Sequence, residues 1–136
     1  MTLQIHKNLY AVVRLPSQAE EPPWLHKVPF YSSTRTKDEL SIVCPQACVP
    51  GTQDCQEREW RLLQVKGTLD FSLTGILASI AVPLAHNAIS IFALSTFDTD
   101  YILVKNDQLT KAQKALVKAG FALEFEVEDN SPGPLP

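Results

Sequence analysis

The stretch from Trp60 to Lys66 (WRLLQVK) constrains the fold more than any other part of the sequence. Its apolar side chains alternate as in a strand, with Trp60 and Leu62 on one face and Leu63 and Val65 on the other. A strand that is apolar on both faces has to be covered on both sides. We therefore predict helices over one face, and burial of the other face against the first half of the chain or a second copy. On this basis we expect a homodimer.

The elements after this strand follow a regular order. Apolar residues at helical spacing predict a helix that Asp70 or Ser72 caps, that Pro83 kinks or ends, and that Asn87 stops in the left-handed conformation. Two antiparallel strands are predicted next, at 89–95 and 100–105. A second helix follows at 106–120, capped by Asn106 or Asp107 and ended by Gly120, and a last strand is predicted at 121–127. The order β-α-β-β-α-β is that of a ferredoxin-like unit, with four antiparallel strands and both helices on one face.

The first half of the chain predicts a smaller set of elements. Strands are expected at 9–15, 30–36 and 40–44, with one short helical turn at Trp24–Leu25 and a linker at 46–56. This order resembles a reduced copy of the second half; only the order of elements suggests a repeat. Because such a copy lacks its own last strand, we expect the two halves to share a sheet or exchange elements. The predicted organisation is an N-terminal module with linker, a C-terminal module and a disordered tail, at residues 1–58, 59–128 and 129–136.

Composition excludes several classes of function. The chain has 136 residues, 45% of them apolar and 20% charged, which fits one domain or two small packed modules. The net charge is −3 and no basic run is present, so we expect no nucleic-acid partner. No apolar run reaches the roughly 18 residues that span a bilayer, and the N-terminus does not resemble a signal peptide. We expect no membrane association and a cytoplasmic location.

The sequence gives little support to catalysis or to a bound metal. Cys44, Cys48 and Cys55 are not at zinc-ribbon spacing and the histidines are scattered, so ordinary free thiols are favoured over a metal site. Ser72 lies in no G-x-S-x-G motif, and no Gly-rich phosphate loop is present. We expect no cofactor, no metal and no enzymatic activity.

Two stretches resemble a known family. LDFSLTGIL (69–77) and STFDTDYILV (95–104) are similar to the C-terminal module of small tandem ACT-domain proteins, of the ACT subfamily shared with CASTOR-type arginine sensors and related to aspartokinase regulatory domains. The resemblance extends over 60–121, and FYSSTRTKDELSIVCPQ (30–46) resembles the N-terminal module of the same group. It implies an α+β protein of two ferredoxin-like (βαββαβ) ACT modules, the N-terminal one reduced, with antiparallel sheets, helices on one face and often a dimer.

The resemblance also implies a function. ACT domains generally bind small ligands, most often amino acids, and control something else. We therefore expect a non-catalytic regulatory or sensor protein that binds an amino acid and acts on a partner protein. The alternative is a protein–protein association module that binds no small ligand.

In the sensor relatives the amino acid lies between modules, next to the strand-to-helix loop and an acidic turn. By position, the implied ligand-binding residues are Asp70, Phe71, Ser72, Leu73, Thr74, Gly75, Ser95, Thr96, Phe97, Asp98, Thr99 and Asp100.

Elementary chemistry assigns roles to some of these residues. Backbone N–H groups of Leu73, Thr74 and Gly75, at a helix start, suit a carboxylate. Asp98 or Asp100 suits the ammonium group, and Asp70 suits the ammonium or a basic side chain. The alternative is structural: Asp70 and Ser72 only cap the helix, and Asp98 and Thr99 only build the turn. We also expect that one module need not bring the loop and the turn together, whereas two adjacent modules or subunits could.

Overall fold

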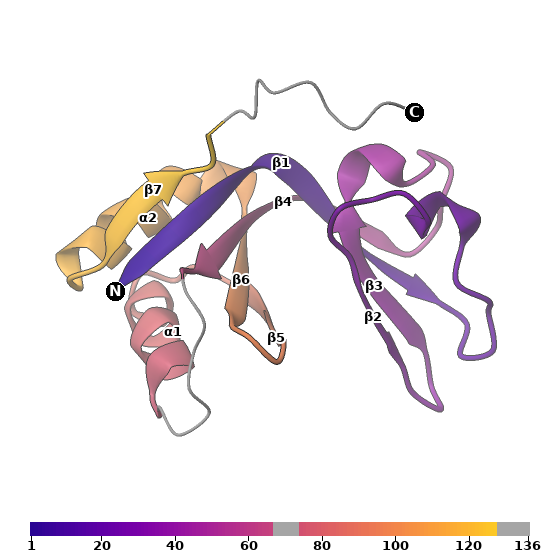
Figure 1. The fold of residues 1–136 in the computed structure, drawn as a ribbon, viewed down its shortest axis with the longest axis horizontal. Coiled ribbons are helices and arrows are strands. Elements are labelled where there is room, and N and C mark those ends of the chain that lie inside the picture. Colours follow the sequence, from indigo (N-terminus) through magenta and orange to yellow (C-terminus); the bar gives the residue numbers. More distant parts are fainter. Residues whose placement is uncertain (67–73, 128–136) are drawn as a thin grey trace.

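The computed structural model describes residues 1–66 and 74–127, so the predicted tail lies outside the described residues. The elements, in chain order, are β1 (Thr2–Leu15), η1 (Pro23–Leu25), β2 (Ser32–Arg35), β3 (Leu40–Pro45), η2 (Gln46–Cys48), β4 (Gln56–Val65), α1 (Ile76–His86), β5 (Ile91–Ser95), β6 (Asp100–Lys105), η3 (Asn106–Gln108), α2 (Leu109–Lys118) and β7 (Ala122–Phe125). Figure 1 shows two wings, one with both helices and one without, joined along β1 and β4. The mixed α/β architecture agrees with the predicted class.

All described strands belong to one seven-stranded sheet. Its order is β2-β3-β1-β4-β6-β5, and β7 pairs with β1 outside this path. The second half of β1 (10–15) pairs with β3, whereas its first residues (2–5) lie between β4 and β7. The two halves therefore share a sheet, and β1 belongs to both of them.

The position of β1 corrects the predicted ferredoxin-like order. We expected the last strand to join an antiparallel sheet of four strands from the second half. Instead β7 runs parallel to β1, which separates β7 from β4. The reason is that Leu3 and Ile5 alternate toward the same core as Leu63 and Val65, so β1 fills the place next to β4. The prediction of a first strand at 9–15 was too short because Lys7 and Asn8 interrupt the apolar pattern.

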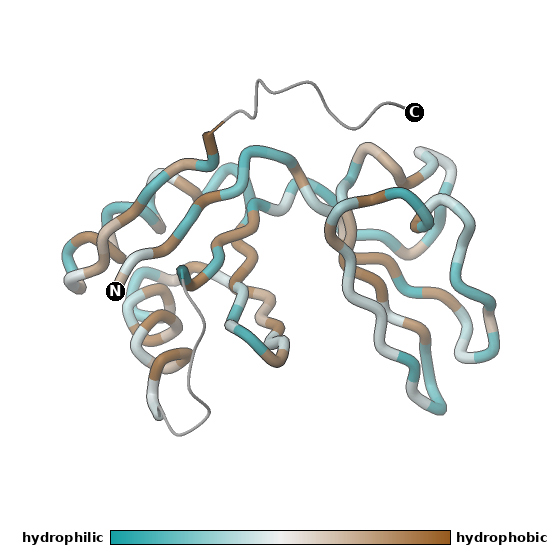
Figure 2. The backbone as a smooth tube through the Cα atoms, viewed as in Figure 1, coloured by the Kyte–Doolittle hydropathy of each residue, from teal (hydrophilic) through white to brown (hydrophobic). Residues whose placement is uncertain are grey.

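One face of the sheet carries the helix layer. Leu3, Ile5, Leu63 and Val65 pack there against residues of α1, α2 and β6, among them Ile80, Leu84, Ile102, Val104, Leu109, Ala112 and Leu116. Figure 2 shows that hydrophobic residues occur in α1 and in the strands of both wings, interspersed with hydrophilic ones. No described helix is long and apolar enough to cross a bilayer.

The opposite face is buried within the same chain. Trp60 and Leu62 are 8% and 0% exposed and pack with Tyr10 and Val43 of the first half and Leu103 of β6. Aromatic rings continue this cluster between the halves: Phe30 lies 5.8 Å from Tyr10 and 5.0 Å from Tyr101 between ring centroids. The first half therefore covers the second face of β4, and this face does not need a second subunit.

The two halves repeat one three-stranded pattern. Val13 of β1 lies opposite Ile42 of β3, and Leu63 of β4 lies opposite Ile102 of β6. The β2–β3 and β5–β6 turns also share their bonding: Thr36 N donates to Glu39 O at 2.8 Å, and Thr96 N donates to Thr99 O at 2.9 Å. The first half has only the short η1 and η2 where the second has α1 and α2.

The helix ends differ from the predictions in two places. Gly75, with φ +78°, is the N-cap of α1, so the helix begins after Asp70 and Ser72, which lie outside the described residues. At the other end Asn87 has φ −99° and Ala88 takes the left-handed conformation with φ 57°. Asn87 instead donates from its side chain to Pro83 O at 2.8 Å, inside the last turn. The helix therefore continues past Pro83 to His86, and Pro83 does not end it.

The intrachain burial of the second face makes a stability prediction. Leu62→Ala should lower the free energy of unfolding by about 2–5 kcal/mol, because it removes buried methyl groups and leaves a cavity. Urea denaturation measures this change. The matched control is Leu77→Ala, at a 37% exposed position of α1, with an expected change within about 0.5 kcal/mol. Equal losses in the two variants would contradict burial of this face.

Candidate functional site

The acidic turn between β5 and β6 is held by its own polar groups. Thr96 Oγ1 donates to Thr99 O and accepts from Thr99 N, both at 3.3 Å. Ser95 Oγ donates to a carboxylate oxygen of Asp100 at 2.6 Å. Four of the predicted ligand-binding residues, Ser95, Thr96, Thr99 and Asp100, therefore have a structural role in the turn. Phe97 and Asp98 lie at its exposed tip.

Thr99 connects this turn to the end of β4. Its side chain is 5% exposed, and its hydroxyl donates to the backbone oxygen of Val65 at 2.8 Å. The directions of the strands agree with this contact. Because β4 and β5 are both antiparallel to β6, their carboxyl ends lie at the same end of the sheet. A single chain therefore brings the acidic turn next to the end of β4. Residues 67–73 of the loop lie outside the described residues, so the expectation that one module need not bring the loop and the turn together stays a prediction.

The start of α1 is only partly described. Asp70, Phe71, Ser72 and Leu73 lie outside the described residues, whereas Thr74 and Gly75 are described and exposed. Ser79 N donates to Gly75 O at 2.8 Å, which is the first bond of the helix. The N–H groups without an intrahelical acceptor are consequently those of residues 75–78. Of the three N–H groups predicted for a carboxylate, that of Gly75 is among them, and those of residues 76–78 follow it.

The two carboxylates of the turn differ in their surroundings. Asp100 already accepts the Ser95 hydroxyl. Asp98 has no hydrogen bond or ion pair to the described part of the chain. The equivalent turn of the first half carries Asp38, and there Arg14 donates to Asp38 O at 3.0 Å and lies 3.6 Å from the Glu39 carboxylate. Within 1–66 and 74–127, the acidic turn of the second half lacks such a cation.

Two tyrosines, Tyr10 of β1 and Tyr101 of β6, contact Phe30 where the two halves meet. Burial, and secondarily the nearby charge of Asp98, raise the pKa of Tyr101. Burial raises the pKa of Tyr10 to about 12, with smaller effects of Glu126 and Tyr101. Both phenols therefore stay neutral at physiological pH. The sequence analysis missed Tyr101, although it directly follows Asp100, because its alternation matched an ordinary strand residue.

The cysteines do not assemble with other metal ligands in the described structure. Cys44 is buried, Cys48 is half-buried and Cys55 is exposed. Burial, and then the neighbouring Cys48, raise the pKa of the Cys44 thiol. Among the described residues, no three His, Cys, Asp or Glu side chains are close enough together to hold a metal ion.

Family models match both halves of the chain. The model of the ACT domain matches residues 56–118, which run from the start of β4 to the end of α2. A second model, described as the N-terminal domain of another protein group, matches residues 8–52. No curated protein matches the chain.

Solved structures extend this likeness to almost the whole chain. The protein Atu0741 from Agobacterium tumefaciens is 37% identical, with 93% of this chain and 94% of that chain covered and a TM-score of 0.86. The chain therefore belongs to the family of this Agobacterium protein, and residues 56–118 of the chain match the ACT domain.

Two aspartate kinase structures share the fold at low identity. Aspartate kinase from Clostridium acetobutylicum is 16% identical, with a TM-score of 0.62 over 86% of this chain and 34% of that chain. The ligand-free regulatory subunit of aspartate kinase from Thermus thermophilus is 9% identical, with a TM-score of 0.55 over 82% of this chain and 91% of that one. These likenesses show that the chain shares its fold with parts of aspartate kinases.

The Thr99 contact generates a first test of the site. Thr99→Val keeps the shape of the side chain but leaves Val65 O without its donor, so the free energy of unfolding should fall by about 1–3 kcal/mol. Thr34→Val, on the exposed β2 strand, is the matched control and should change little. Chemical denaturation of both variants measures the difference. If the Thr99 variant loses no more than the control, the hydroxyl does not hold the turn.

The raised pKa of Tyr10 predicts a loss of stability in alkali. The folded state keeps the phenol proton up to about pH 12, whereas the unfolded chain releases it near pH 10. Stability from this group is therefore complete below pH 10 and lost as the pH rises toward 12. Tyr10→Phe should flatten this part of the stability curve, and Tyr31→Phe, at a 44% exposed position, should not. Denaturant unfolding at several pH values compares them; identical curves for all three proteins would contradict the pKa shift.

Proposed function

We propose that this protein is a cytoplasmic, non-catalytic regulator that binds an amino acid beside the β5–β6 turn and controls a partner protein. The class follows from the ACT domain at residues 56–118, and the likeness to a regulatory subunit of aspartate kinase supports a regulatory role without catalysis. The observation that carries the position of the site is the hydrogen bond between Thr99 and Val65, which joins the acidic turn to the strand end before α1.

The charges around the turn support a ligand with a cationic group. Asp98 is exposed and carries a negative charge that no described residue neutralises. In the equivalent turn of the first half, Arg14 donates to the backbone oxygen of Asp38 and pairs with the carboxylate of Glu39. In this proposal the ammonium group of an amino acid is the cation at the second turn, where it pairs with Asp98. The N–H groups at the start of α1 offer a site for the ligand carboxylate.

The proposal treats the first half as a reduced ACT module, as in the tandem subfamily of CASTOR-type sensors. Support comes from the shared strand register and from the recurrence of Thr36, Asp38 and Ile42 as Thr96, Asp98 and Ile102 at matching places. The separate family model over 8–52 is consistent with a boundary near residue 58.

A second candidate is an association module that binds no small ligand. The strands β2 and β5 end the main strand order, so each has one edge unpaired within the described chain. Open edges pair readily with other strands. A second copy of this chain is the simplest partner for them, which would also give the homodimer that we expect.

A thermal-shift screen against the twenty amino acids tests the proposed ligand. A ligand at 100 times its dissociation constant should stabilise the protein by roughly 2.7 kcal/mol. Asp98→Asn should then weaken the binding of that amino acid by about 1.5–3 kcal/mol in calorimetry, because it removes the charge that faces the ammonium group.

The control for this variant is Asp38→Asn, which makes the same change in the equivalent turn of the first half. It should leave the affinity unchanged. Equal binding by wild type and Asp98→Asn would move the site elsewhere. Absence of any stabilising amino acid, together with a dimer in sedimentation at tens of micromolar, would favour the association module.

A further inference from the structure

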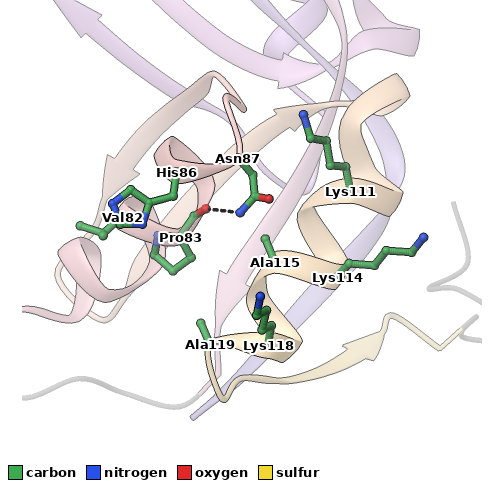
Figure 3. Close-up of a pocket in the computed structure, with 9 residues that line it drawn as sticks. All are labelled: Val82, Pro83, His86, Asn87, Lys111, Lys114, Ala115, Lys118 and Ala119. Carbon is green, nitrogen blue, oxygen red and sulfur yellow. Dashed lines mark hydrogen bonds between the residues drawn. The ribbon is translucent and has the colours of Figure 1, made fainter.

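A groove runs between the two helices on the outer side of the helix layer. It has a volume of about 510 Å³, and no residue of the acidic turn lines it. Figure 3 shows Val82, Pro83 and His86 of α1 on one side and the lysines of α2 on the other. The full lining is Val82, Pro83, His86, Asn87, Lys111, Lys114, Ala115, Lys118 and Ala119.

The groove combines an apolar floor with a basic rim. Small apolar side chains come from both helices, and Val82 is 49% exposed. The rim contains Lys111, Lys114 and Lys118, and no carboxylate lines the groove. The groove is thus positively charged although the whole chain has a net charge of −3.

The lysines of the rim have no partner in the described structure. Lys66 and Lys105 each lie within 3.4 Å of a glutamate, but no described carboxylate is within ion-pair distance of Lys111, Lys114 or Lys118. Helix α2 contains no Asp or Glu. The rim therefore presents three uncompensated positive charges on one helix.

Helix stability does not explain this arrangement. Lys111 lies in the first turn of α2, where the helix dipole disfavours a cation. Lys114 and Lys118 are four residues apart, a spacing at which like charges repel and destabilise a helix. Only Lys118, in the last turn, has a favourable position for the helix itself.

We propose that the α1–α2 groove binds an acidic amphipathic segment of a partner protein. An open groove between two helices suits a peptide whose apolar side chains meet the floor while its Asp and Glu side chains meet the rim. The charge complementarity selects an acidic partner and suppresses basic ones. The lining contains no arginine, Phe, Tyr or Trp, which are the residues that stack and clamp nucleic acids. The inference goes beyond the proposed amino-acid site and does not depend on it.

A model peptide tests this proposal. The probe is a fluorescein-labelled amphipathic helix of Leu, Ala and Glu, and its control carries Gln at every Glu position. Fluorescence anisotropy should show saturable binding of the acidic peptide, at least about tenfold tighter than the Gln control, and weaker at high salt because exposed charges are screened.

Two kinds of variant separate docking in the groove from general charge attraction. The triple variant Lys111→Glu, Lys114→Glu, Lys118→Glu should lower the affinity for the acidic peptide by at least about tenfold. Lys37→Glu, in the β2–β3 turn, should leave this affinity unchanged. Ala119→Leu leaves the charge unchanged and fills the groove, so it should also weaken binding. Circular dichroism melting shows whether each variant is folded.

Several results would overturn the proposal. Unchanged affinity in the triple variant or in Ala119→Leu would show that the peptide binds elsewhere. If polyuridylate or vesicles containing phosphatidylserine bind more tightly than the acidic peptide, and this binding needs the three lysines, the groove binds another kind of anion. A homodimer that dissociates in the triple variant would make the groove a contact between copies. Loss of amino-acid binding without loss of peptide binding would affect only the proposed function.

Discussion

The pairing of β1 with β4 is the interaction on which the rest of the structure depends. These two long strands run through both halves, so the sheet continues from β2 at one end to β5 at the other. Two register shifts between them, after Ile5 and after Tyr10, let the strands bend where the two wings meet. The helix layer, the aromatic cluster of Tyr10, Phe30 and Tyr101, and the acidic turn all take their positions from this shared pair.

The sequence predicted the second half well because its signals are local. Alternation in 60–66 and 100–105 and helical spacing from Ile76 onward identify elements that the structure contains. It failed where the deciding contact is distant: the place of β7 depends on Leu3 and Ile5, which come from the other end of the chain. The left-handed residue after α1 was missed because Asn87 uses its side chain on Pro83, and Ala88 adopts the positive φ.

The same distinction applies to the candidate site. The sequence predicted a polar turn at 95–100, because Ser, Thr and Asp favour turns. It could not predict that Thr99 bonds to Val65, a contact between residues that are distant in sequence, or that Asp100 is occupied by Ser95 while Asp98 is not. The recurrence of Thr36, Asp38 and Ile42 as Thr96, Asp98 and Ile102 was also missed, although the three pairs have one constant spacing in the sequence. The matching strand registers support this alignment.

The parallel pairing of β1 with β7 has a consequence for the order of folding. Residues 2–5 are synthesised before their partners at 122–125, which follow both helices in the chain. Closing a loop of this length costs entropy before the contacts that reward it can form. Until β7 has been synthesised, residues 2–5 of β1 consequently have one unpaired edge. A nascent chain with such an edge can pair wrongly with strands of other chains. The glutamate that follows β7 completes the closure: Glu126 N donates to Ile5 O at 2.9 Å, and its carboxylate accepts from Lys7 N at 3.1 Å.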